Sequence, residues 1–124
     1  MSYLVDSSGW LEFFTDGTLA KKYFDYLKKL EKVVVPSLVV YEVYKKIKKE
    51  RSEEEALLAI AHMAEGKIVA FDDTLALSAA DISIKHNLSM ADAIIYATAL
   101  YEEAKLITSD SHFSGLNNVV FLKK

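Results

Sequence analysis

The sequence has no cysteine, only four glycines and one proline, and a single arginine, Arg51. Without cysteine the chain has no disulfides, no thiolate metal ligands and no cysteine nucleophile. With so little glycine and proline there is no flexible linker, so we expect residues 1–124 to form a single domain. No uncharged apolar run reaches the roughly 18 residues of a membrane span, and residues 1–6 lack a signal-peptide pattern. These absences predict a cytoplasmic protein outside the membrane.

The composition indicates a chain with a core and without strong positive charge. Hydrophobic residues make up 52% of the 124 positions, which excludes wholesale disorder. Fifteen basic residues stand against 18 acidic ones, giving a net charge of −3. This balance argues against a protein that holds nucleic acid mainly by positive charge. It is compatible with a nuclease whose site supplies its own carboxylates and a metal ion.

Five short apolar runs with no polar alternation predict strands that are buried on both faces of a parallel sheet. They are Tyr3–Val5, Val33–Val35, Ile68–Phe71, Leu106–Thr108 and Val119–Leu122. The stretches between them predict helices over Thr18–Leu30, Ser37–Glu50, a segment that Ser52 opens, a segment from Asp73 or Thr74 to His86, and a segment from Ser89 through Glu103. Ser37, Ser52 and Ser89 are the expected N-caps of three of these helices. The alternation predicts an α/β fold, a three-layer sandwich with a central parallel sheet of about five strands. Along the chain, two consecutive helices separate the second strand from the third, and two more separate the third from the fourth.

Four carboxylates each stand as the only charge in a long uncharged stretch: Asp6, Glu42, Asp92 and Asp110. Burying a carboxylate is unfavourable unless it is paired or bound to a metal, so four of them invite one shared explanation. Asp6 follows the first predicted strand and Asp110 lies just past the fourth, where ligands of open α/β sheets bind. Glu42 and Asp92 lie in the first two turns of their helices. The four could converge on one pocket that suits Mg²⁺ or Mn²⁺.

Each of these residues also has a structural interpretation. Asp6 could cap the helix after the first strand, Asp92 could belong to a capping box with Ser89, and Asp110 could be a turn residue. Glu42 is the hardest to explain this way, because apolar residues surround it in its helix.

Other acidic and imidazole side chains receive structural interpretations. His62, His86 and His112 are too scattered in sequence for a metal set. His112 is near Asp110 and could touch substrate, but we favour its interpretation as a turn residue. Asp72 and Asp73 follow the third predicted strand, and Asp73 is expected to cap the next helix.

Four segments carry these acidic residues in order: Val5-Asp6-Ser7-Ser8, Pro36 to Glu42, Leu88 to Ala99, and Thr108-Ser109-Asp110-Ser111-His112-Phe113. Together they resemble the PIN domain family and, within it, the VapC-type toxin ribonucleases of toxin–antitoxin pairs. Each motif alone is weak, but four in order over nearly the whole chain are specific.

This resemblance implies an endoribonuclease that depends on Mg²⁺ or Mn²⁺ and leaves 5′-phosphate and 3′-hydroxyl ends on RNA. The implied acidic quartet, which would hold the metal and carry catalysis, is Asp6, Glu42, Asp92 and Asp110. Ser7 and Thr108 match hydroxyl positions that would support the carboxylates. The resemblance also implies a homodimer, and a cognate antitoxin whose tail blocks the site.

Two alternatives differ in function. A response-regulator receiver domain has a similar length, a parallel five-stranded sheet and a carboxylate Mg²⁺ site; here Asp72 or Asp73 would accept the phosphate, and Lys123 follows the last strand. In that case Glu42 and Asp92 would have no role, and the paired helices fit poorly. The second alternative is a PIN-like domain that binds RNA or protein without cleaving it.

Overall fold

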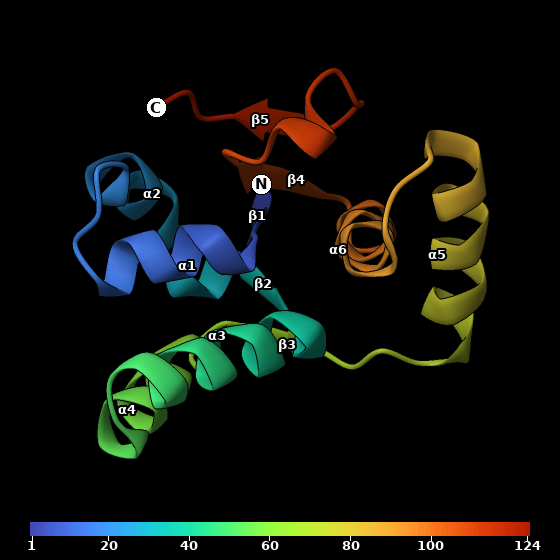
Figure 1. Ribbon diagram of the computed structural model, residues 1–124. Coiled ribbons are helices and arrows are strands. Elements are labelled where there is room, and N and C mark those ends of the chain that lie inside the picture. Colours follow the sequence, from blue (N-terminus) through green and yellow to red (C-terminus); the bar gives the residue numbers. More distant parts are fainter.

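The computed structural model describes all 124 residues and has a five-stranded sheet between two layers of helices (Figure 1). The strands are β1 (Ser2–Val5), β2 (Val33–Pro36), β3 (Lys67–Val69), β4 (Ala104–Thr108) and β5 (Val119–Phe121). Every pairing is parallel, and the order across the sheet is β3-β2-β1-β4-β5. The predicted α/β class is therefore confirmed.

The strand order also separates the two parallel folds considered from the sequence. Receiver domains have the flavodoxin-like order 2-1-3-4-5, in which the third strand neighbours the first. Here β3 lies at the edge of the sheet beyond β2, and β1 neighbours β4. The receiver interpretation therefore does not fit this sheet.

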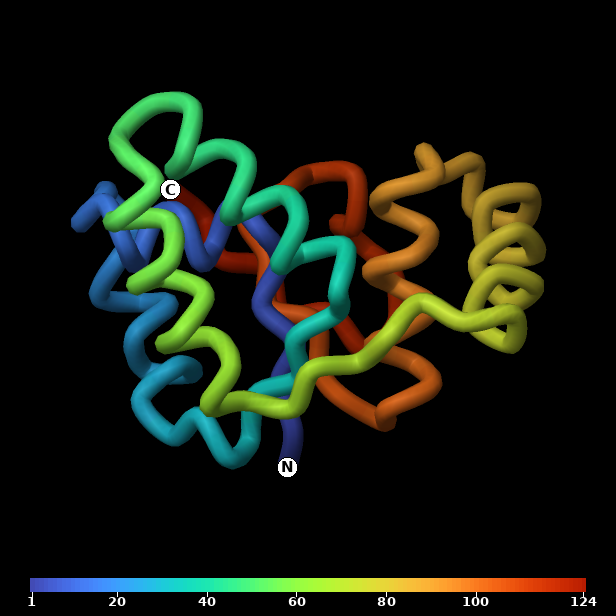
Figure 2. Tube along the Cα trace, turned by 90° about the horizontal axis from the view of Figure 1, so that it is seen from below, coloured from blue at the N-terminus to red at the C-terminus, as the bar shows by residue number.

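Six helices and two short 3₁₀ turns connect the strands. The helices are α1 (Ser7–Phe14), α2 (Ala20–Leu27), α3 (Ser37–Glu50), α4 (Glu53–Met63), α5 (Asp73–His86) and α6 (Met90–Tyr101), and the turns are η1 (Leu30–Lys32) and η2 (Ser111–Phe113). Figures 1 and 2 agree that α1 to α4 lie on one side of the sheet, while α6, backed by α5, covers the other. None of these helices combines the length and the apolar character that a bilayer crossing requires.

The hydrophobic core lies on both faces of the three central strands. β2 is buried along its whole length, and Leu4, Val5, Leu106 and Ile107 are completely buried in β1 and β4. The edge strands differ, because Lys67 and Ile68 of β3 and Phe121 of β5 are exposed. The expectation that all five strands are buried on both faces was therefore wrong for β3 and β5, since each has a neighbour on one side only.

Two of the predicted helix caps are wrong. The N-cap of α3 is Pro36 rather than Ser37, whose hydroxyl instead donates to the carbonyl of Val69 and ties the helix to β3. The N-cap of α5 is Asp72 rather than Asp73, because the Asp72 side chain accepts a hydrogen bond from the backbone of Leu75. The structure confirms the other two caps, Ser52 and Ser89.

The first crossover contains a helix that the sequence pattern missed. One helix was predicted over Thr18–Leu30, but α2 is shorter and α1 precedes it. Gly9 makes this packing possible, since a Cβ there would lie 2.5 Å from both the Tyr23 ring and the Val5 side chain. The glycine thus lets α1 press directly against α2 and the end of β1.

The connections define a switch point between β1 and β4. The chain leaves β1 through helices on one side of the sheet and enters β4 from α6 on the other side (Figure 1). In open α/β sheets, ligands bind beyond the carboxyl ends of the strands where the connections diverge in this way. A ligand site is therefore expected among the residues that follow β1 and β4.

Candidate functional site

Asp6 directly follows β1 and is held in place by three hydrogen bonds. The side chain is buried, with 4% of its surface exposed. Its Oδ1 accepts from the Ser8 hydroxyl at 3.1 Å and from the Gly9 backbone at 3.0 Å, and its Oδ2 accepts from the Thr108 hydroxyl at 2.5 Å. A carboxylate with three donors in a buried place has one fixed orientation.

Thr108 connects the ends of β1 and β4. The register pairs Val5 with Ile107, so that Asp6 and Thr108 lie side by side at the end of the two strands. The Thr108 hydroxyl donates to Asp6 and accepts a hydrogen bond of 2.9 Å from the backbone of Asp110. One buried hydroxyl therefore sets the positions of two acidic residues.

Burial raises the pKa of Asp6 above its ordinary value, since the charged form loses its hydration. The hydrogen bonds from Thr108, Gly9 and Ser8 oppose this effect, and the negative charge of Asp110 adds to it. The two acidic residues lie close together because both contact the Thr108 hydroxyl.

Glu42 projects from the second turn of α3 toward the same place. Burial raises its pKa, the Ser7 hydroxyl lowers it, and the charges of Asp6 and Asp92 raise it further. Its Oε1 atom is buried and has no hydrogen-bond partner. A buried carboxylate oxygen without a donor, next to two other carboxylates, is unfavourable unless a cation binds there.

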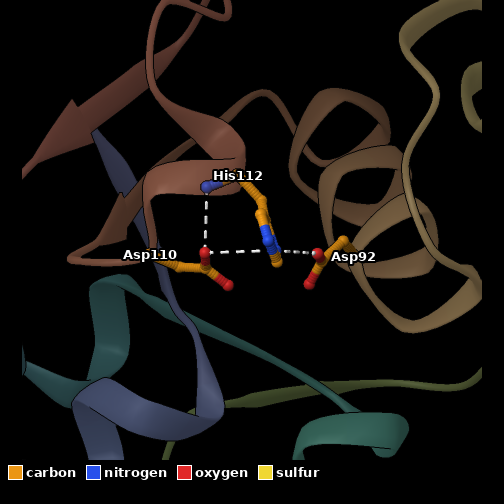
Figure 3. Close-up of side chains that lie close together, drawn as sticks. All are labelled: Asp92, Asp110 and His112. Carbon is orange, nitrogen blue, oxygen red and sulfur yellow. Dashed lines mark hydrogen bonds and ion pairs between the residues drawn. The ribbon is translucent and has the colours of Figure 1, made fainter.

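Asp92, Asp110 and His112 form a second group of side chains at the surface of the site (Figure 3). The Nδ1 atom of His112 lies 3.1 Å from Asp92 Oδ2 and 3.3 Å from Asp110 Oδ1. One potential ligand atom from each residue falls within 4.8 Å of the others. Asp92 comes from the first turn of α6, His112 from η2 and Asp110 from the N-cap of η2, so this group bridges two parts of the chain.

The structural interpretations of Asp6 and Asp110 hold, whereas that of Asp92 does not. Asp6 is the N-cap of α1 and Asp110 is the N-cap of η2, each through a hydrogen bond to a backbone amide. Ser89 caps α6, but the Asp92 side chain contacts His112 instead of completing a capping box. Capping therefore fixes the backbone around the site and leaves carboxylate oxygens free to face it.

The four predicted site residues are thus linked in one neighbourhood. Asp6 and Asp110 share Thr108, His112 joins Asp110 to Asp92, and Glu42 experiences the charges of Asp6 and Asp92. The prediction of their catalytic and metal-binding roles stays a prediction.

The interpretation of His112 as a turn residue missed its contacts. The ring is within reach of Asp92, which is 20 residues away in the sequence. In the sequence, the only indication that His112 belongs to the site was its position two residues after Asp110. His62 does not join the site, because its ring packs against Trp10 and Phe14. His86 packs edge-on against Tyr96, and it borders a shallow pocket of about 310 Å³ that Asp92 and His112 also line.

Tyr23 packs behind the site and contacts the loop after β4. Its ring occupies the space that Gly9 leaves open, and its hydroxyl donates to the Ser109 hydroxyl at 3.0 Å. Burial raises the pKa of Tyr23 to about 12, and the negative charge of Asp6 adds to the effect. The phenol therefore stays protonated and keeps the loop after β4 in place.

The sheet and these side chains define an open parallel α/β fold with an acidic site at its switch point. The PIN domain family model matches residues 3–118. The chain therefore belongs to the PIN domain family. No curated protein sequence matches the chain at a significant level.

Several solved structures have the same fold. A toxin–antitoxin complex from Klebsiella pneumoniae contains a chain that is 23% identical, with a TM-score of 0.85, and the match covers 99% of this chain and 100% of that one. VapBC2 from Rickettsia felis, crystallised with a DNA fragment from its promoter, is 17% identical with a TM-score of 0.78, covering 99% and 98%. VapC20 of Mycobacterium tuberculosis, described as a toxin that cleaves the sarcin-ricin loop, is 19% identical with a TM-score of 0.76, covering 99% and 98%. At these identities the comparison shows the shared fold.

Proposed function

We propose that this protein is a metal-dependent endoribonuclease that hydrolyses RNA phosphodiester bonds. The observation that carries the proposal is the buried, unpaired Oε1 of Glu42, which lies beside Asp6 and Asp92. Membership of the PIN family adds support, since nucleases of this family generally depend on divalent metal ions. We assign the catalytic and metal-binding roles to the quartet of Asp6, Glu42, Asp92 and Asp110.

The residues present fit a divalent cation such as Mg²⁺ or Mn²⁺. Carboxylate oxygens are the ligands that these ions prefer, and mutual repulsion among several acidic groups is relieved when a cation binds. Glu42 offers an oxygen with no competing donor, and Asp92 and Asp110 offer oxygens close to the surface. When bound, such an ion would polarise the scissile phosphate and lower the pKa of an attacking water.

The chain itself supplies the rigidity of this site. Thr108, Ser8 and Gly9 hold the Asp6 carboxylate in one orientation at the end of β1. Burial raises the pKa of Glu42, and Ser7, at the start of α1, partly opposes this effect. We therefore assign supporting roles to Ser7 and Thr108.

The proposed biological role is that of the toxin in a VapBC-type toxin–antitoxin pair in the cytoplasm. Support comes from the solved structures of the same fold, which include a toxin–antitoxin complex from Klebsiella pneumoniae and VapBC2 from Rickettsia felis. We propose that a cognate antitoxin covers the acidic site. We also propose that the protein forms a homodimer. The exposed apolar side chains of Leu77 and Ile84 on α5 are consistent with a surface that contacts another protein chain.

The activity is tested by incubating the protein with RNA in the presence of Mg²⁺ or Mn²⁺, with EDTA as the metal-free control. We expect cleavage only with metal, and fragments with 5′-phosphate and 3′-hydroxyl ends. Metal-independent cleavage with cyclic phosphate ends would contradict the proposal. Tight RNA binding without cleavage would favour a PIN-like binding domain instead.

A further inference from the structure

The ring of His112 contacts the carboxylates of two members of the proposed quartet. Its ring lies between Asp92 and Asp110, with Nδ1 directed at an oxygen of each (Figure 3). The side chain is 70% exposed. The interaction with the two carboxylates is therefore what holds the ring in this position, because packing does little to restrain it.

The backbone around His112 helps to preset this geometry. The backbone amide of His112 donates to Asp110 Oδ1 at 2.9 Å, so the carboxylate and the ring are fixed relative to each other within one turn. Asp92 approaches from the first turn of α6, whose N-cap is Ser89. Two independent elements thus bring two oxygens and one nitrogen together.

The spacing of these three atoms matches adjacent ligands of one ion. In an octahedral site with ligand distances of about 2.1 Å, neighbouring ligand atoms are separated by about 3 Å. The distances from Nδ1 to the two oxygens are 3.1 and 3.3 Å, and all three potential ligand atoms lie within 4.8 Å of one another. The two nitrogen–oxygen distances are therefore close to those between adjacent ligands of one ion.

We infer that His112 is a nitrogen ligand of the divalent ion in this site and that it shifts the metal preference from Mg²⁺ toward Mn²⁺ and other transition metals. This inference rests on the proposed function, because it concerns the same acidic site. Imidazole binds first-row transition metals well, whereas Mg²⁺ prefers oxygen and gives up its water reluctantly. On binding, Nδ1 would present its lone pair to the ion and the ring proton would reside on Nε2.

The inference predicts a metal-specific effect of removing the ring. His112→Asn should weaken Mn²⁺ binding by about tenfold or more, the scale at which groups around a metal site act on affinity. Mg²⁺ binding should change by less than about twofold, because the carboxylates that serve it remain. The matched control is His86→Asn, which removes the other imidazole that borders the same pocket but makes no contact with the acidic pair.

The experiment measures bound Mn²⁺ directly, by titration followed with electron paramagnetic resonance, in the wild-type protein and both variants. Electron spin-echo modulation then reports whether a nitrogen nucleus is coupled to Mn²⁺, and protein labelled with ¹⁵N-histidine assigns this nitrogen to a histidine. We expect nitrogen modulation in wild type and in His86→Asn, and its loss in His112→Asn together with the loss of Mn²⁺ affinity.

Two results would overturn the inference in distinguishable ways. If Mn²⁺ binds without nitrogen modulation, the carboxylates hold the ion without a nitrogen ligand. If the modulation survives in His112→Asn, the coupled nitrogen belongs to another group. In either case His112 is not the ligand and the proposed nuclease site still stands. If Mn²⁺ does not bind to wild-type protein at all, the metal dependence in the proposed function fails as well.

Discussion

Thr108→Val should destabilise the protein at neutral pH and loosen the centre of the acidic site. Valine keeps the branched shape of threonine but replaces the hydroxyl, which here donates to Asp6 at 2.5 Å and accepts from the backbone of Asp110. A hydrogen bond to a charged group contributes about 1.5–3 kcal/mol, and a neutral one about 1 kcal/mol. The combined loss is about 2.5–4 kcal/mol in the free energy of unfolding.

This loss corresponds to a clear change in melting temperature. For a chain of 124 residues, 1 kcal/mol shifts the melting temperature by about 4 °C. Thr108→Val should therefore melt about 10–16 °C below wild type at neutral pH. Thr108→Ser is the matched control, because it keeps the hydroxyl and loses only a methyl group, at about 1 kcal/mol.

The difference between wild type and Thr108→Val should also depend on pH. Burial raises the pKa of Asp6 above 3.8, and the Thr108 hydroxyl partly opposes this, so that its removal raises the pKa further. A carboxyl with a raised folded pKa loses stability as the pH rises from its unfolded pKa through its folded pKa. The variant's deficit should therefore be largest at neutral pH and shrink as the pH falls toward 3.8.

Thermal melts of the three proteins from about pH 4 to about pH 8 measure this dependence. The reasoning is refuted if Thr108→Val is as stable as Thr108→Ser at neutral pH, or if its deficit is the same at every pH.

Three further perturbations test other parts of the structure. Glu42→Gln should raise the melting temperature at neutral pH, because burial and neighbouring charges raise the pKa of this carboxyl and one of its oxygens has no hydrogen-bond partner. The gain in melting temperature should disappear as the pH falls toward 4.5. A lower melting temperature than wild type at neutral pH would contradict this prediction. Gly9→Ala should lower the free energy of unfolding in urea by about 1–3 kcal/mol, since the added Cβ would lie 2.5 Å from both Tyr23 and Val5; a variant as stable as wild type would show that α1 and α2 can separate. Millimolar Mn²⁺ should raise the melting temperature of wild type by mass action. Asp92→Ser should lose most of this rise, because serine keeps a polar side chain in the first turn of α6 but removes the charge. An equal rise in both proteins would show that Asp92 does not belong to the metal site.

The strands were predictable because their apolar runs are short, uncharged and rich in β-branched residues. The positions of β1, β2, β4 and β5 agree with the sequence pattern to within one or two residues. β3 begins one residue earlier than predicted, at Lys67, and ends two residues earlier, at Val69. The helix α1 was missed, since Gly9 and the aromatic residues Trp10 and Phe14 are weak helix formers, and the helix depends on the Asp6 cap and on packing.

The acidic residues of the candidate site were accessible from the sequence because each is isolated among uncharged neighbours. Strand ends give an approximate position in parallel folds, so Asp6 and Asp110 could be placed at one sheet edge. His112 could not be placed in this way, since its contact with Asp92 depends on how α6 and η2 meet in space. The choice between Asp72 and Asp73 as the cap of α5 was also open, because both are good caps and only the backbone decides.

The most direct test of the proposed nuclease is RNA cleavage by Asp6→Asn beside Asp72→Asn, at equal protein concentration with Mn²⁺. Both aspartates cap a helix that follows a strand, and asparagine preserves a cap, so the two variants differ in whether the lost charge belongs to the acidic site. We expect Asp72→Asn to cleave like wild type and Asp6→Asn to lose cleavage while its melting curve stays cooperative. Equal cleavage by Asp6→Asn and wild type would contradict the assignment of the acidic site.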